Sequence, residues 1–231
     1  MPVARSSLQG FDAEDEALVV VSALNALASI AEARGDLAAA SAAYEALVRR
    51  CRATGQPIQV PFSLVALAAL RARQGDDAAA DGLYAEAIDC SLNPWVTADA
   101  MVGQAAVARR RGDLPRSRAL LDTAAGHYRD IDLPAGRPRV LAGLAWWALA
   151  AGHLQDAAVF AADAADGALA SGDPATQLLA ETVVAAVKAV ADPARQHVEA
   201  FVALAQRRAG GLAYRSLTDG PDVAALAARL G

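Results

Sequence analysis

Lysine, cysteine and aromatic residues are scarce in this chain, and each scarcity excludes a class of protein. Lys188 is the single lysine among 21 basic residues, and the net charge of −5 argues against general nucleic-acid binding. Two cysteines in 231 residues are too few for a disulfide scaffold, so we expect a reducing, cytoplasmic environment and interpret Cys51 and Cys90 as small, mostly buried hydrophobic residues. Aromatic residues make up 5% of the chain, whereas the 55% of hydrophobic residues includes much alanine, which favours closely packed helices.

Long apolar segments are also missing. The longest runs, "LVVVSALNALASIA" and "LAGLAWWALAAG", are too short or too polar to span a membrane, which takes about 20 residues. The N-terminus has no apolar stretch of signal-peptide length. We therefore expect no membrane association and interpret both runs as buried helices.

Catalytic and metal-binding motifs are absent as well. No glycine-rich phosphate loop and no G-x-S-x-G nucleophile motif occurs. None of the three histidines has a neighbour at i+3 or i+4 that completes a metal pair, so a packing or solvated role is expected. The sequence therefore predicts a protein that is not an enzyme, with no catalytic residues, metal or cofactor. The histidines are His127, His153 and His197.

The tripeptide Arg-Gly-Asp, known as a cell-adhesion signal, occurs twice, at 34–36 and 111–113. Glycine favours the positive φ that ends a helix, arginine suits the last turn of a helix, and aspartate caps the next one. We therefore interpret the tripeptide as a turn between two helices. Related turns recur at separations of 40, 37 and 40 residues, which is typical of a stacked repeat. Their glycines are Gly35, Gly75, Gly112 and Gly152, and a degenerate fifth copy centres on 192–193.

The residues around these turns resemble the tetratricopeptide repeat (TPR). Ala40-x₃-Tyr44 matches the second half of its signature, and Leu27-Ala28 matches its Leu-Gly pair with alanine for glycine. The copies run longer than the 34-residue consensus, like the stretched repeats found in sensing arms of bacterial regulators. The resemblance implies an all-α, right-handed superhelix (a solenoid) of about five helix pairs with a C-terminal capping helix.

We expect residues 1–231 to form a single domain. The breakers "TGQP", "LNP", "LPAGRP" and "SGDP" separate the helix pairs. Pro221 is expected to open the last helix, which should cap the open end of the array. The predicted repeats are 13–54, 58–91, 95–129, 137–170 and 175–208, and the capping helix is 221–230. Their helices are 13–34, 37–54, 58–74, 77–91, 95–111, 114–129, 137–151, 154–170, 175–190 and 193–208.

The resemblance also implies a binding groove on the concave face, formed by the first helix of each pair. That groove would be polar at one end and apolar in the middle, with arginine and tryptophan together. Trp146 and Trp147 point about 100° apart on a helix, so Trp147 is expected in the core, while core and groove both stay open for Trp146. The candidate binding residues are Asn25, Ser29, Phe62, Val65, Val102, Arg109, Arg139, Ala142 and Trp146.

These features predict a non-catalytic scaffold that binds a protein or peptide, of the kind found as the sensing arm of bacterial transcriptional regulators. Residues 109–139 carry a net charge of +4 and residues 1–40 a net charge of −4, so the basic segment is either a solvated helical face or a patch for an acidic peptide or the acidic end of a second copy. Nucleic acid is disfavoured because no aromatic residues alternate with the arginines. Two alternatives are a small-molecule sensor or carrier, with an apolar pocket at Phe62, Val65 and Trp146, and an accessory subunit of an enzyme complex.

Overall fold

All regular structure described by the computed structural model is α-helical. The model describes residues 19–54, 58–134, 136–209 and 220–230, and no strand occurs within them, which confirms the all-α prediction. The helices are 19–33, α2 (Leu37–Ala53), α3 (Gln59–Arg73), α4 (Asp77–Cys90), α5 (Pro94–Arg110), α6 (Leu114–Asp130), α7 (Gly136–Ala150), α8 (Leu154–Ser171), α9 (Pro174–Ala191), α10 (Arg195–Ala209) and α11 (Gly220–Leu230).

The bounds of these helices agree with the sequence prediction to within two residues from α2 onward. Residues 13–18 of the first predicted helix lie outside the described part of the chain. Of the helices that the structure describes, none combines the length and apolar character needed to cross a membrane.

The repeated tripeptide joins two helices, as expected. Gly35 has a φ of +74°. The N–H of Asp36 donates to the carbonyl of Ala31 at 2.9 Å, and the N–H of Gly35 donates to that of Glu32 at 3.0 Å, which satisfies carbonyls left over at the helix end. The Asp36 side chain then caps α2 by accepting from the N–H of Ala39 at 2.9 Å. The other glycines with this positive φ at a repeat turn are Gly75, Gly112 and Gly152.

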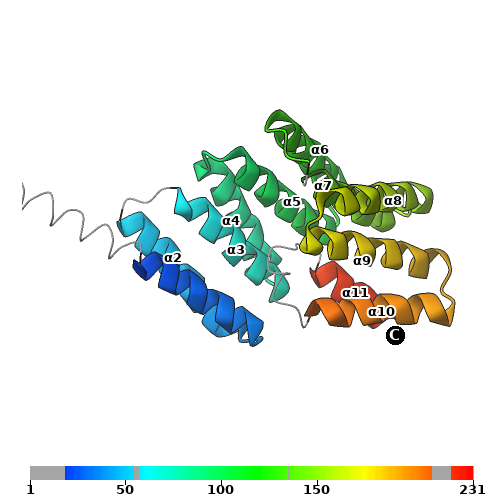
Figure 1. The fold of residues 1–231 in the computed structure, drawn as a ribbon, viewed down its shortest axis with the longest axis horizontal. Helices are drawn as coiled ribbons and strands as arrows, with labels where there is room; N and C mark the ends of the chain where they lie inside the picture. The colour runs from blue at the N-terminus through cyan, green and yellow to red at the C-terminus, as the bar shows by residue number, and fades with distance from the viewer. Residues whose placement is uncertain (1–18, 55–57, 135, 210–219, 231) are drawn as a thin grey trace, which may run out of the picture.

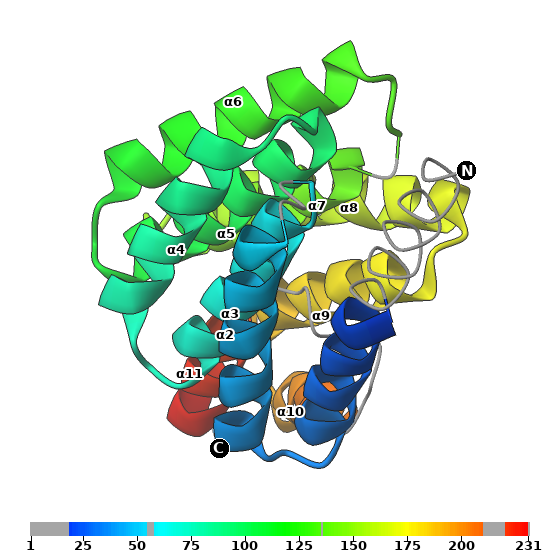
Figure 2. The same cartoon turned by 90° about the vertical axis from the view of Figure 1, so that its left-hand side faces the viewer.

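The helices form two layers. Each helix from α2 to α11 packs against the next one along the chain, as Figure 1 shows. The odd-numbered helices also contact one another in order, α3 with α5, α5 with α7 and α7 with α9. Among the described residues, α2, α4, α6, α8 and α10 make no contact of that extent with the next even-numbered helix. The odd-numbered helices therefore form one continuous layer, and the even-numbered helices cover its other side (Figure 2).

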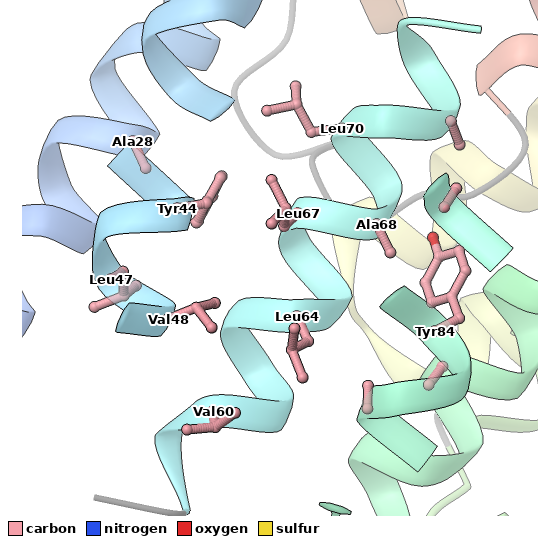
Figure 3. Packing of buried hydrophobic residues seen from close by; sticks show 14 of the residues in the cluster. Ala28, Tyr44, Leu47, Val48, Val60, Leu64, Leu67, Ala68, Leu70 and Tyr84 are labelled. Carbon is pink, nitrogen blue, oxygen red and sulfur yellow. The ribbon is translucent and has the colours of Figure 1, made fainter. Parts of the chain in front are cut away.

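Small and aromatic side chains alternate in the seams between the helices. In the first pairs, Tyr44 of α2 lies toward Leu67 of α3, and Ala68 on the other side of α3 faces Tyr84 of α4 (Figure 3). Ala68 is fully buried, which lets α3 and α4 approach closely. α4 and α5 also approach closely at Gly103 of α5, where a Cβ atom would lie 2.3 Å from the Tyr84 ring. The tyrosine expected from the repeat signature thus requires a glycine on the following helix.

The last helix packs on the last helix pair and also on helices from earlier in the chain. The sequence placed it over the open end of the array, against the last helix pair. In the structure α11 contacts α10 and α9, and it also contacts α3 and forms ion pairs with α5 (Figure 1). The expected contact with the last pair is therefore present, and the contacts with α3 and α5 are additional to the prediction.

Candidate binding face around α11

The odd-numbered helices hold α11 on one side of their layer. We call the surface formed by the residues of α3, α5, α9 and α10 that contact α11 the α11 face. α3, α5 and α9 are each the first helix of a pair, the kind of helix to which the repeat resemblance assigns partner binding, whereas α10 is the second helix of the last pair. A helix of the same chain therefore covers part of the helices on which a partner was expected (Figures 1 and 2).

An ion pair between Arg109 and Asp222 attaches α11 to α5. Nη2 of Arg109 lies 2.7 Å from Oδ2 of Asp222, and the Nε–H donates to Oδ1 at 3.3 Å. Both side chains are nearly inaccessible, with 4% of Arg109 and 11% of Asp222 exposed. Within the described residues Nη2 is buried without a well-aligned hydrogen bond, so its 2.7 Å contact acts by charge more than by hydrogen bonding.

A second arginine extends this pair into a four-membered network. Nη1 of Arg110 lies 3.3 Å from Oδ2 of Asp222, while its Nε–H donates to both carboxylate oxygens of Asp77 at 3.2 Å. The network of Arg109, Arg110, Asp77 and Asp222 has no net charge. Without Asp222 it would carry one positive charge in a mostly buried site, which is costly unless another anion replaces the carboxylate.

The two helix ends in this network suit its charges. Arg109 and Arg110 lie in the last turn of α5, and Asp222 lies in the first turn of α11. Cations stabilise the carbonyl end of a helix and anions the amide end, by about 0.3–1 kcal/mol each near the surface. The same charges therefore stabilise both helices and join them.

Two buried apolar side chains, together with the half-buried Ala227 and Leu230, add to the attachment. Val223 and Leu226 of α11 are 4% and 6% exposed, and they belong to the same buried cluster as Trp146, Leu179 and Val183. Burying a valine or leucine side chain stabilises by about 1.5–3 kcal/mol. An isolated helix of eleven residues is marginal in water, so these contacts are what keep α11 helical.

The predicted binding residues nearest the N-terminus remain accessible. Asn25 is exposed and Ser29 is half-buried, both on the helix over 19–33. Glu32, one turn further on, is buried, accepts a hydrogen bond from the hydroxyl of Tyr44 at 3.0 Å and pairs with Arg73 at 2.7 Å. Asn25 and Ser29 thus lie on the same helix as the Glu32 carboxylate, whose position is fixed by its contacts with Tyr44 and Arg73.

The apolar candidates do not form one pocket. Phe62 meets Trp95 edge-on, with ring centroids 5.9 Å apart. Val65 packs against the cluster around α2 to α4, and Val102 against the cluster around α5 to α7, each half-buried. Trp146 is 5% exposed and belongs to the cluster that includes α7 to α9. The structure therefore places Trp146 in the core, while Val65 belongs to a different cluster and Phe62 packs on Trp95.

Arg139 and Ala142 also belong to the packed interior. Nη1 of Arg139 lies 2.9 Å from Oδ1 of Asp99, and the hydroxyl of Tyr128 donates to the same oxygen. Ala142 is buried in the cluster of Trp146. Arg109 pairs with Asp222 and Arg139 with Asp99, whereas Trp146 lies in the apolar cluster that also contains Val223 and Leu226 of α11.

The positive charge of the arginine-rich segment is largely neutralised within the chain. Arg116 donates to both carboxylate oxygens of Asp81, at 2.9 and 3.0 Å, and Arg118 pairs with Asp122 at 3.0 Å. Burial raises the pKa of Asp81, but the hydrogen bonds from Arg116 outweigh it and hold the pKa below its usual value. Arg111 lies 3.5 Å from the same carboxylate. Acidic side chains of the preceding repeat therefore neutralise most of the positive charge that was expected to attract an acidic partner.

One apolar cavity lies between α6 and α7, away from the α11 face. Its volume is about 340 Å³. Two exposed arginines, Arg129 and Arg137, stand at its rim with Asp132. The pocket is thus in a different place from the one predicted at Phe62, Val65 and Trp146. Its apolar lining comprises Ala125, Tyr128, Leu133, Val140, Leu141 and Leu144.

The cysteines and histidines form no metal site in the part of the chain that the structure describes. Cys51 is buried, and burial raises the pKa of its thiol. Cys90 is exposed, contrary to the expectation that both cysteines are mostly buried. Trp147 lies between helices as expected, with its Nε1–H donating to the carbonyl of Leu114 at 2.9 Å.

The chain was compared with protein-family models and with curated proteins. No protein-family model matches the chain, and no curated protein matches it. The likeness to tetratricopeptide repeats therefore remains a resemblance of residue pattern.

Asp222 is the residue of this face that the sequence analysis missed. The segment "PDVAALAARL" carries the signal, because an acidic first turn precedes apolar residues at helical spacing. Arg109 was expected to meet an acidic partner, and the partner present is this carboxylate. The spacing of residues along the sequence could not identify Asp222 as the partner of Arg109, since 113 residues separate the two side chains.

Proposed function

We propose that this protein is a non-catalytic helical-repeat scaffold that binds a segment of a partner protein on the α11 face. The observation that carries the proposal is α11 itself, an amphipathic helix held across α3, α5 and α9 by two buried apolar residues and an ion pair. Helix-in-groove recognition uses the same elements, namely an apolar stripe with a few directional polar contacts.

The arrangement of the odd-numbered helices supports a concave binding surface. Neighbouring helices pack about 8–10 Å apart, so α3 and α9, three steps apart, would be separated by about 30 Å in a flat layer. An eleven-residue helix is about 16 Å long. With a packing distance of about 8–10 Å at each of its ends, α11 reaches both α3 and α9 and so spans the layer between them. A layer spanned in this way fits a right-handed superhelix of about five tetratricopeptide-like pairs, and with it the role of a sensing arm in a bacterial transcriptional regulator.

A selection from a library of displayed 16-residue peptides, against the full chain, tests the proposal. We expect enriched peptides whose affinity falls at least tenfold when Arg109 of the α11 face is changed to Met. The matched control is Arg118→Met, which removes the charge of a more exposed arginine on α6. Failure to enrich any peptide, or equal loss of affinity in the control, would refute peptide binding by this layer.

The cavity between α6 and α7 supports a second candidate function, the binding of a small amphiphile. Its apolar lining and the two arginines at its rim fit an aliphatic or aromatic carboxylate. Val140→Trp should fill the cavity and abolish any thermal shift that such a ligand produces. A ligand that stabilises the filled variant equally would place its site elsewhere.

A further inference from the structure

We infer that α11 is an internal competitor of the partner, and that the partner's binding segment is an amphipathic helix with an acidic residue in its first turn. This inference rests on the proposed function and specifies the chemistry of its ligand. α11 occupies the face at α3, α5 and α9, so an external helix can bind there only when α11 leaves.

The charges left behind define what the incoming segment must carry. Arg110 keeps Asp77 as its partner, whereas the buried guanidinium of Arg109 loses Asp222 when α11 leaves. The empty face then holds two arginines and one aspartate, an excess of a single positive charge. One carboxylate restores neutrality, while a second one would be uncompensated. An acidic peptide with many carboxylates therefore fits this face less well than a helix with one acid at its start.

The apolar contacts set the spacing of the remaining residues. Val223 and Leu226 follow Asp222 by one and four positions, and both are buried. Ala224, Ala225 and Ala228 between and beyond them are exposed. A competing segment therefore needs an acid followed at one and four positions by branched apolar residues, with small or polar residues tolerated on the other side.

α11 has an advantage over a free peptide in this competition because it belongs to the same chain. A tethered segment has an effective concentration on the order of mM, so a free peptide of equal intrinsic affinity displaces it poorly. Substitutions in α11 that weaken its packing remove this disadvantage of the free peptide and leave the residues of the α11 face unchanged.

A fluorescein-labelled peptide with the sequence of α11, GPDVAALAARL, provides the probe. Its binding to three full-length chains is measured by fluorescence anisotropy: the wild type, the double variant Val223→Ser with Leu226→Ser, and a control with Ala224→Ser and Ala225→Ser. We expect the first variant to bind the peptide at least tenfold more tightly than the wild type and the control do. A peptide with asparagine in place of its aspartate should lose at least tenfold in affinity for that variant.

Equal affinity for all three chains, or equal affinity of the two peptides, would overturn the inference. If the double variant fails to fold, hydrogen exchange of the wild type decides. Unlabelled peptide at mM concentration must accelerate exchange of the amides over residues 220–230, and unchanged exchange would overturn the inference. A concentration-dependent dimer that excludes the peptide would also overturn it, because the occupant would then be α11 of a second copy.

The outcomes separate this inference from the proposed function. Library peptides that release α11 but carry no acid in their first turn would leave the proposed function standing and refute the inferred chemistry of the partner. Binding of the α11 peptide to the loosened variant, together with a library selection that yields no ligand, would support an internal contact and refute an external partner.

Discussion

Arg109 in the last turn of α5 and Asp222 in the first turn of α11 form a buried ion pair across 113 residues of sequence. This pair connects the most basic segment of the chain to its last helix. It links α11, which packs on the last helix pair, to the middle of the repeat array as well. It also places a carboxylate at the position where an acidic partner was expected.

Asp222→Asn should loosen α11 selectively. Removing the charge of Asp222 leaves the buried guanidinium of Arg109 without a full counter-charge. The resulting loss of free energy cannot exceed the free energy with which α11 packs on the repeat array, because α11 can detach. We expect amides of α11 to exchange at least tenfold faster, a change of about 1.4 kcal/mol, while those of α2 to α8 do not change. Asp122→Asn, which breaks an exposed pair on α6, is the control and should leave all these rates unaltered.

Gly112 should resist substitution for a conformational reason alone. Its φ is +81°, and no atom lies within 4 Å of the place where a Cβ would stand. Gly112→Ala should therefore lower the free energy of unfolding by about 1–2 kcal/mol without any clash. Gly126 in the middle of α6 also has open space around it, and Gly126→Ala should raise that free energy by up to about 1 kcal/mol. Changes of the same sign in urea denaturation would contradict the turn assignment.

Two buried tyrosines should respond oppositely to loss of their hydroxyls. The hydroxyl of Tyr84 is buried and has no hydrogen-bond partner among the described residues, whereas that of Tyr128 donates to the carboxylate of Asp99. Tyr84→Phe should leave stability unchanged or increase it, while Tyr128→Phe should cost about 1.5–3 kcal/mol. Thermal unfolding of both variants measures the difference. Equal losses of stability in the two variants would contradict the absence of a hydrogen-bond partner for the Tyr84 hydroxyl among the described residues.

Acid should remove the contribution of Asp81 to stability. Its folded-state pKa lies below the usual value, so the contribution is complete above the unfolded pKa of about 3.9 and is lost as the pH falls through the folded value. Between about pH 5 and pH 2 the wild type should therefore lose more free energy of unfolding than Asp81→Asn does. Arg116→Gln should flatten the pH dependence in the same way, because it removes the hydrogen bonds that lower the pKa. Parallel curves for the three proteins would contradict this assignment.

Local chemistry made the helices predictable from the sequence. A glycine of positive φ followed by a capping aspartate specifies the end of one helix and the start of the next within a few residues, as at Gly35 and Asp36. The alternation of alanine with tyrosine in the seams, as at Ala40 and Tyr44, likewise follows from helical spacing.

The placement of α11 could not be predicted in the same way, because it depends on contacts between residues far apart in the chain. Counting charges along the sequence left Arg116 as part of a free basic patch, although Asp81 of the preceding repeat neutralises it. Helical spacing also left both the core and the groove open for Trp146, and only the packing of α7 against α8 and α9 decides for the core. Which surface stays accessible for a partner therefore depends on the tertiary fold.

The displacement of α11 by a competing helix is tested most directly by a distance measurement between spin labels. One label is placed at Ala228→Cys on the exposed side of α11 and the other at Ala78→Cys on α4, with Cys51 and Cys90 replaced by serine. The free protein should give a single narrow distance distribution. Saturating GPDVAALAARL should replace it with a broad distribution at longer distances, because α11 leaves the face. A narrow distribution that stays unchanged while the peptide is bound would contradict the claim that the two helices compete for one site.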